Sequence, residues 1–502
     1  MPSNEARGAE KYRGSAAALL LLAGLIALAV ILRFARLSHW GFDSDEIFML
    51  RDSLHPRLTN PRPLLYLINH YLVLPLMPLD ELGLRLLPAV FGVLAIPAFY
   101  WVARRLVGTR AALFGTLLLT LSGLHVNYSQ FGRYWSLVFL LSAVYPYALF
   151  LGLRDGDRRA LGIGIVTGLL ASLAHPASVL LVGGPLIWAL VTYLRPRYLR
   201  ALWSRHVVRW GALLLLALVA VIAARFLPIL QGWISQHDAN PGSGQFLLRP
   251  PPLGLKQLIY LMAFVEGWSV SVVLAAVVGV YLLWHARDRI LARFLTSLVL
   301  FPVVFLTLIS IRTPVSTYYL IPTAPVLFLG AGFFLDRVAA LDWKVRPRWL
   351  LPATVTLLVL IPGTPTLASQ YLNGRRYDFR GVAQWLVPQL TPSDAVFSDQ
   401  PVALAHYLPG MEVQRLRYNT APLDESMRAA QRSGPAAALW IVAPAPAHPF
   451  RTNLRQGGLA KWIFSHCQLR NSIGHGRVDF RQQYLHVYRC PPALSPETAD
   501  TR

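Results

Sequence analysis

The stretch AAALLLLAGLIALAVIL, residues 16–32, decides the class of this protein. It contains no charged side chain, and its length approaches the roughly 20 apolar residues that a helix needs to cross a bilayer. No small-residue cleavage site follows it, only residues 33–40 and further apolar runs, which favours a retained span over a signal peptide. The sequence therefore predicts an α-helical polytopic membrane protein.

The composition of the whole chain indicates the same class. Of its 502 residues, 55% are hydrophobic and only 14% are charged, and the mean hydropathy is +0.46, too apolar for the surface of a soluble protein. The net charge of +23 comes from short Lys and Arg clusters between apolar runs, a pattern that orients spans rather than binds nucleic acid. We expect membrane lipids, and no nucleic acid, as partners.

Basic clusters after every second apolar run predict the orientation, with the N-terminus in the cytoplasm. About eleven spans result from counting the apolar runs. They are 16–32, 84–103, a run ending at 127, one from 135, one ending before 175, one from 176, one reaching 228, 268–284, one ending at 312, one ending at 337, and 349–366. The prediction is a transmembrane catalytic domain over residues 1–366 and an extracytoplasmic domain over residues 367–502.

The C-terminal part has the composition of a small soluble α/β domain. Residues 395–397, 439–442 and 484–488 are typical of strands, and the amphipathic stretches 379–390 and 423–432 are typical of helices. The domain holds no motif that indicates chemistry. Its two cysteines, Cys467 and Cys490, form either one disulfide or two free thiols, and no cysteine-based metal site is expected.

The first outer loop, residues 37–79, holds the strongest catalytic candidates. Residues 46–54 and 63–76 predict short helices lying in the membrane interface. Just before them come Asp43, Ser44, Asp45 and Glu46, which suit a helix N-terminus, with Asp43 or Ser44 as the cap. A carboxylate here is also suited to act as general base on an acceptor hydroxyl.

Two further outer segments carry candidate binding residues. Arg62 lies between Pro61 and Pro63, so a rigid turn would present its guanidinium to a phosphate, although arginines near headgroups often only anchor the chain. Residues 127–135, NYSQFGRYW, would place Tyr134 and Trp135 in the interfacial aromatic belt, but that belt does not explain Gln130 with Arg133. His175 and Glu266, each at the outer end of a span, are weaker candidates.

The order of these segments resembles the GT-C integral-membrane glycosyltransferases of the protein O-mannosyltransferase and lipid A aminoarabinose transferase type. The resemblance rests on motifs in the same order along the first spans and one later motif. They are Trp40 before Asp45-Glu46, Pro61-Arg62-Pro63 with Tyr66, Glu81 before Leu84-Arg85-Leu86-Leu87-Pro88, Tyr128-Ser129-Gln130-Phe131-Gly132-Arg133, His175-Pro176, and Tyr319-Leu320-Ile321-Pro322.

The resemblance implies transfer of a sugar, with inversion, from a polyprenyl-phosphate donor at the periplasmic face. It implies Asp45 as general base, with Glu46 beside it in the catalytic motif, and Arg62 and Arg133 on the donor phosphate. The implied substrate-binding set is Arg62, Tyr66, Tyr128, Gln130, Arg133, His175 and Tyr319. The acceptor is a lipid, a glycan or a protein, and the Ala, Leu, Arg and Pro bias favours a bacterial inner membrane.

The sequence departs from that family at the positions that often help to hold a divalent metal ion. Phe131 and Pro61 replace the acid or histidine expected there. Substitutes for these ligands are available in Asp43, Glu46, Glu81 and Glu266, and a metal-free reaction is the alternative because a phosphate leaving group can be stabilised by arginine alone. No organic cofactor is expected.

Two other functions use the same lipid-linked sugars. A transporter or flippase would show internal repeats and ionisable groups near the midplane, whereas the candidates here lie at one face and no repeat is visible. An O-antigen ligase or polymerase would rely on outer Arg and His residues without needing a carboxylate. Replacement of Asp45 therefore distinguishes the ligase from the transferase.

Overall fold

The computed structural model describes residues 4–57, 60, 62–175, 178, 180–193, 210, 213, 217, 220, 224, 267–286, 288–309, 317–341, 347–372, 374–416, 420–433, 437–444, 458–474 and 484–491. The chain forms two compact units. The first is helical and contains Met1–Leu37, Asp52–Gly244 and Pro250–Leu367, and the second combines Ser38–Arg51 and Gln245–Arg249 with Ala368–Arg502.

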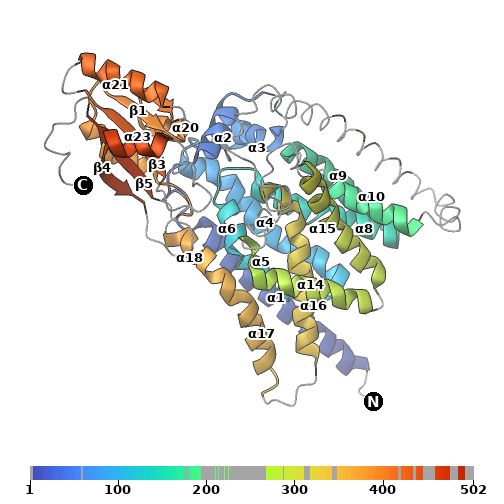
Figure 1. Ribbon diagram of the computed structural model, residues 1–502. Helices are drawn as coiled ribbons and strands as arrows, with labels where there is room; N and C mark the ends of the chain where they lie inside the picture. Colours follow the sequence, from blue (N-terminus) through green and yellow to red (C-terminus); the bar gives the residue numbers. More distant parts are fainter. Residues whose placement is uncertain are drawn as a thin grey trace. The chain divides into compact units, whose positions relative to one another are not determined.

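The first unit is built from helices that follow the apolar runs (Figure 1). They are α1 (Asn4–Phe34), α2 (Ser44–Leu54, which begins in the second unit), α3 (Pro63–Ile68), the π-helical turn η1 (Asn69–Val73), α4 (Glu81–Val107), α5 (Thr109–Thr120), α6 (Gly123–Ser129), α7 (Trp135–Ser142), α8 (Tyr145–Asp155), α9 (Arg158–Ala174), α10 (Leu180–Tyr193), α14 (Val270–His285), α15 (Arg289–Ile309), η3 (Thr317–Thr323), α16 (Ala324–Ala340), α17 (Leu350–Leu360), η4 (Ile361–Gly363) and α18 (Thr364–Leu372).

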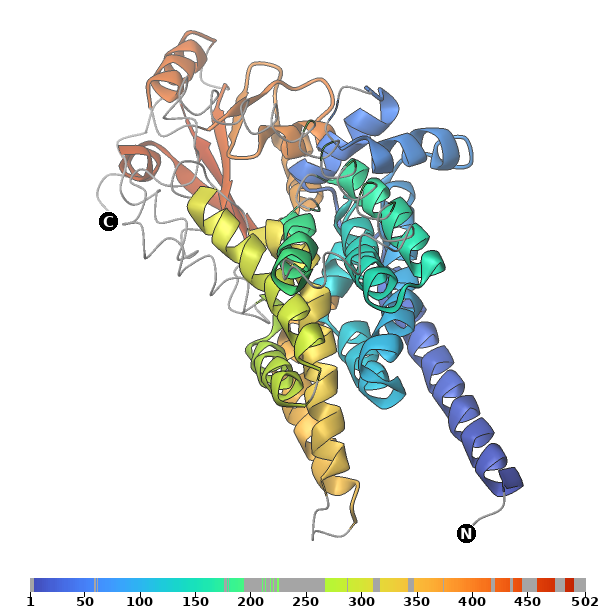
Figure 2. The same cartoon turned by 90° about the vertical axis from the view of Figure 1, so that its right-hand side faces the viewer.

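Among the described residues, six helical segments are long and apolar enough to cross a bilayer. They are Ala16–Phe34, Glu81–Val107, Trp135–Asp155, Arg289–Leu308, Tyr318–Ala340 and Leu350–Leu372, and each coincides with a predicted span. The pair α5 and α6 is also long and apolar enough when taken together, but it bends by 62° at its break, as a broken span or a re-entrant loop does. The first span belongs to α1, a continuous helix of 31 residues (Figure 2). The polytopic fold is confirmed, whereas the count of eleven stays a prediction, because the run reaching 228 lies largely outside the described residues.

Glycines set the closest helix contacts of this unit. A Cβ atom at Gly332 on α16 would lie 2.4 Å from the Ala111 carbonyl oxygen and 2.6 Å from the Gly115 nitrogen on α5. A Cβ atom at Gly279 on α14 would lie 1.9 Å from the Gly330 carbonyl oxygen, again on α16. Since backbones approach this closely only where side chains are absent, α16 packs between α5 and α14 through small residues, as is common for helices in lipid.

The C-terminal part is an α/β domain around a five-stranded sheet of order β2-β1-β3-β5-β4 (Figure 1). Its elements are α19 (Phe379–Leu386), η5 (Val387–Gln389), β1 (Ala395–Ser398), α20 (Pro401–Tyr407), β2 (Val413–Arg415), α21 (Ala421–Ser433), β3 (Leu439–Pro444), α23 (Gly458–His466), β4 (Gln468–Ile473) and β5 (Leu485–Cys490). β1 pairs in parallel with β2 and β3, and β5 pairs antiparallel with β3 and β4.

Helices cover both faces of this sheet. One face buries Phe397, Ile441 and Tyr488 against α21 and α23, and the other turns Trp440 toward Trp385 on α19. This alternation is the period of two that a strand imposes. The three predicted strands and two predicted helices are confirmed. Cys467 and Cys490 form a disulfide, which decides between the two alternatives left by the sequence.

Candidate active site

The loop before α3 presents Arg62 as its N-cap residue. The Arg62 backbone N–H donates to Asn60 Oδ1 at 3.0 Å, and Asn60 Nδ2 donates to Asp52 Oδ2 at 2.8 Å. Pro63 then occupies the first turn of α3, where its missing N–H costs nothing. The Tyr66 hydroxyl donates to the Arg57 carbonyl, so Tyr66 fixes the start of the same loop. Pro61 lies outside the described residues.

The arginines of the predicted donor site converge on one hydroxyl group. Arg62 Nη1 donates to the Tyr134 hydroxyl oxygen, and Arg133 Nη2 donates to the same oxygen at 3.1 Å. Both guanidinium groups also lie near the Tyr134 ring, with their central carbons 5.4 Å and 4.9 Å from its centroid. Among the described residues, Arg62 has no carboxylate partner, and its buried Nε has no hydrogen-bond partner. Two cations therefore share a neutral acceptor, an arrangement suited to binding an anion.

Aromatic rings pack together beside Tyr134, the residue that both arginines contact. The His175 ring lies 4.6 Å from Tyr134, 4.8 Å from Trp135 and 5.7 Å from Tyr319, measured between centroids. Tyr128 lies 6.4 Å from Trp135. Burial, with the nearby charges of Arg62 and Arg133, lowers the pKa of His175 well below its usual value, so the imidazole is neutral beside the two guanidinium groups. Five of the seven predicted binding residues thus gather around Tyr134 and Trp135.

Gln130 has a different environment from the one its predicted role implies. Its side-chain amide donates to the carbonyls of Leu32, Arg33 and Ala35 at 3.0, 3.3 and 2.9 Å, and so satisfies the C-terminal carbonyls of α1. Arg33 acts in the reverse direction. Its guanidinium donates to the Leu119 and Thr120 carbonyls at the end of α5 and to His125 Nδ1 at 2.8 Å. Gln130 therefore caps α1, which carries Arg33, and Arg33 caps α5. Together the two side chains fix the segment that carries Arg133.

The acidic turn before α2 lies in the second unit. Asp43 Oδ1 accepts the Asp45 backbone N–H at 3.1 Å, and Glu46 Oε2 accepts the Asp43 backbone N–H at 3.0 Å. This is a reciprocal capping box with Asp43 as the N-cap, one of the two caps expected from the sequence. Burial raises the pKa of Asp43 to about 6, although its bond from the Asp45 amide and the charge of Arg376 favour the ionised form.

Glu46 and Asp45 have different surroundings. Glu46 is fully buried and pairs with Arg376, with 2.9 Å between Glu46 Oε2 and Arg376 Nη1. Its carboxylate is therefore occupied by structural bonds. Asp45, one residue before it, is half-buried in the first turn of α2. The assignment of Asp45 as general base, and its joint action with Arg62, stay predictions.

The candidate metal ligands do not form a cluster. Within the part of the chain that the structure describes, no three His, Cys, Asp or Glu residues are grouped so that they could hold a metal ion. Asp43 and Glu46 belong to the capping box, Glu81 begins α4, and Glu266 lies outside the described residues. The described residues therefore do not fit the divalent metal site that the resemblance left open.

Sequence reasoning missed the functions of Tyr134, Arg33 and Arg376. The aromatic belt accounts for Tyr134 equally well on the sequence, and only the fold brings Arg62, 72 residues away, to its hydroxyl. Arg33 follows an apolar run as a flanking arginine would, yet its side chain is fully buried. Two arginines, Arg33 and Arg36, follow the first span within four residues. Because one arginine is enough to flank a span, the other could have been considered as a buried helix cap.

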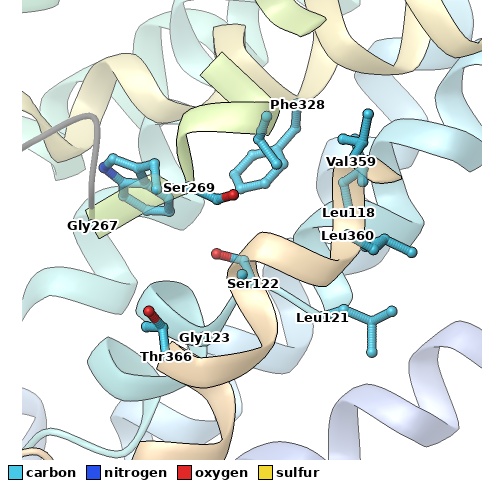
Figure 3. A pocket seen from close by; sticks show the side chains of 13 residues that line it. Leu118, Leu121, Ser122, Gly123, Gly267, Ser269, Phe328, Val359, Leu360 and Thr366 are labelled. Atoms are coloured by element: carbon cyan, nitrogen blue, oxygen red, sulfur yellow. The ribbon is translucent and has the colours of Figure 1, made fainter. Parts of the chain in front are cut away.

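A small separate pocket lies between the α5–α6 break, the start of α14 and η4. Its lining is mainly apolar, with Phe328 and Val359 on its walls. Figure 3 shows the hydroxyls of Ser122, Ser269 and Thr366 turned toward this space. It contains none of the arginines of the donor site.

Comparison with solved structures shows which known proteins have a similar fold. No protein-family model matches the sequence, and no curated protein matches it. Among solved structures, ArnT from Cupriavidus metallidurans is similar in its apo state, with a TM-score of 0.55, 17% identity, and coverage of 94% of this chain and 98% of that one. The same ArnT bound to undecaprenyl phosphate gives 0.52, 16% identity, and coverage of 93% and 97%.

A second similar structure is the archaeal oligosaccharyltransferase AglB from Archaeoglobus fulgidus, in complex with an inhibitory peptide and a dolichol-phosphate. It gives a TM-score of 0.55 at 13% identity, covering 94% of this chain and 76% of that one. ArnT and AglB are both GT-C enzymes. The predicted resemblance is therefore confirmed at the level of structure: this chain has the fold of the GT-C membrane glycosyltransferases.

Proposed function

We propose that the protein is an inverting membrane glycosyltransferase that moves a sugar from a polyprenyl-phosphate donor to an acceptor at the periplasmic face. The observation that carries this proposal is the pair Arg62 and Arg133 on the Tyr134 hydroxyl, beside a neutral His175. An anion entering this site would contact two guanidinium groups. The ArnT structure with undecaprenyl phosphate and the AglB structure with dolichol-phosphate support a donor of this class.

In the proposed reaction the acceptor hydroxyl attacks the anomeric carbon of the sugar. The bond from that carbon to the phosphate oxygen breaks with its electron pair, and the polyprenyl phosphate leaves as an anion. Asp45 takes the acceptor proton, while Arg62 and Arg133 stabilise the negative charge on the departing phosphate. Attack opposite to the leaving group inverts the anomeric centre.

Arg62→Ala is expected to weaken binding of undecaprenyl phosphate by about ten- to a hundredfold, the loss of one charge-assisted contact. Binding of the radiolabelled lipid phosphate to purified protein in detergent measures this. Arg158→Ala, which removes an exposed arginine at the start of α9, is the matched control and should bind as the wild type does. Equal affinity of Arg62→Ala and wild type would show that Arg62 does not hold the phosphate.

The disulfide supports the proposed orientation, because such bonds persist outside the reducing cytoplasm. We expect that protein extracted from the inner membrane and denatured without reductant takes up no maleimide-polyethylene glycol at Cys467 and Cys490. After reduction it should take up two. Two labels before reduction would contradict a periplasmic C-terminal domain.

The sugar and the acceptor can be identified by comparing the products of two strains. Mass spectrometry of surface glycolipids, glycans and proteins from a deletion strain, compared with the complemented strain, should show one missing sugar. The same comparison gives the activity readout for every variant.

A further inference from the structure

The segment that carries Asp45 is part of the C-terminal unit. Ser38–Arg51 forms one compact unit with the chain from Ala368 onward, more than 300 residues later. The sequence shows no chemical motif in the α/β domain, so its contacts with this segment are the clearest indication of what the domain does.

The first set of contacts holds the chain entering the acidic turn. The Trp40 ring packs on Gly374, where a Cβ atom would lie 2.5 Å from the ring and where φ is +66°. Only glycine satisfies both conditions without strain. Next, the Phe42 backbone N–H donates to the Tyr407 hydroxyl, and the Phe42 ring lies 5.4 Å from the His406 ring.

The second set holds the turn itself. Ser44 Oγ donates to Gln400 Oε1 at 2.9 Å, at the loop that follows β1 and begins α20. Glu46 pairs with Arg376, and the two side chains are 0% and 6% exposed. Arg376 Nε in turn donates to the Gly374 carbonyl at 3.1 Å, so one arginine joins the loop under Trp40 to the acid of the capping box.

These bonds are connected through a single carboxylate. Glu46 Oε2 accepts both from Arg376 and from the Asp43 backbone N–H, and Asp43 Oδ1 accepts from the Asp45 backbone N–H. Displacement of Glu46 would therefore release the Asp43 backbone N–H, and Asp43 is the residue that holds the Asp45 N–H. Removing Arg376 would break its ion pair with the buried Glu46 carboxylate, and the loss of one partner of a buried pair is costly.

We propose that the C-terminal α/β domain is the platform that positions the Asp45 turn, and that Arg376 is its positioning residue, acting through Glu46. This inference rests on the proposed role of Asp45 as base. It assigns to the domain a part in the transfer step itself, because the residues that flank Asp45 are bonded to the loop before α19 and to α20.

The test compares Arg376→Gln with Arg376→Lys and with Arg470→Gln, an exposed arginine on β4 that serves as the matched control. Three quantities are measured on each full-length variant: hydrogen exchange of the amides in residues 38–51, binding of undecaprenyl phosphate, and the sugar product in the complemented deletion strain. Tyr407→Phe, which removes only one hydroxyl, serves as the mild variant should Arg376→Gln fold poorly.

Arg376→Gln is expected to speed exchange at the Asp43 and Asp45 amides by about tenfold or more, to leave undecaprenyl phosphate binding unchanged, and to lose the product. Arg376→Lys should restore part of the slow exchange and part of the product, and Arg470→Gln should match the wild type in all three measurements. Unchanged exchange, or faster exchange with wild-type product, overturns the proposal. Failure of wild-type protein to bind undecaprenyl phosphate would instead refute the proposed function. In that case the exchange measurement alone would test whether the α/β domain holds the Asp45 turn.

Discussion

Asp45→Asn is expected to abolish sugar transfer while the protein still binds undecaprenyl phosphate. Asparagine keeps the size of the side chain and its place in the first turn of α2, but it cannot take the acceptor proton. Loss of a general base typically costs about 10² to 10⁴ in rate. Turnover by purified protein with a polyprenyl-phosphate sugar and the acceptor identified by mass spectrometry measures the effect.

Asp43→Asn is the matched control, because asparagine is as good an N-cap as aspartate. Asp43 accepts the Asp45 N–H through one oxygen, which the amide oxygen can replace. If the acidic turn served only to cap α2, both variants would remain active. Wild-type turnover in Asp45→Asn alone would favour the ligase or polymerase alternative, which uses arginine and histidine without a carboxylate.

The spans could be predicted because lipid permits few structures. Every backbone group must be bonded within the segment, so an apolar run of sufficient length can only be a helix. The segments Ala16–Phe34, Glu81–Val107 and Trp135–Asp155 accordingly match their predicted positions. The break between α5 and α6 could not be predicted, because the carbonyls it frees are satisfied by Arg33, 86 and 87 residues away along the chain.

The C-terminal sheet shows a similar limit. β1, β3 and β5 are buried and carry apolar residues, so their sequences indicate strands. β2 and β4 were missed because they are edge strands: β2 has only three residues, and Gln468–Ile473 is mostly polar. Edge strands have one partner and little apolar burial, which leaves a weak pattern in the sequence.

For the candidate site, the sequence predicted residue types better than their roles. Arg62, Arg133 and His175 were each named from local motifs, and the fold brings them to one hydroxyl. Gln130 belongs to the same motif as Arg133, yet its amide is bonded to the carbonyls at the end of α1. A motif places both side chains on one turn, but which of them faces a ligand depends on what packs behind them.

Arg33→Met is expected to destabilise the helical unit strongly. Methionine fills a similar apolar volume but leaves the Thr120 carbonyl and the His125 Nδ1 atom without their donor in a buried site, and it removes one of the donors of the Leu119 carbonyl, which also accepts from the Ser122 backbone N–H. Unsatisfied buried groups cost about 1–3 kcal/mol each, so the total is on the order of several kcal/mol. Thermal unfolding of the purified protein in one detergent, followed by size-exclusion fluorescence, measures the shift.

Arg33→Lys should rescue little, because one ammonium group cannot reproduce the planar fork that reaches acceptors on two sides. Arg159→Met, at an exposed position early in α9, is the control and should unfold with the wild type. Since Arg33 and Gln130 support the same segment, Arg33→Met should also weaken undecaprenyl phosphate binding through displacement of Arg133. A variant as stable as the wild type would show that the bend between α5 and α6 is held by packing alone, and that the buried arginine serves another purpose.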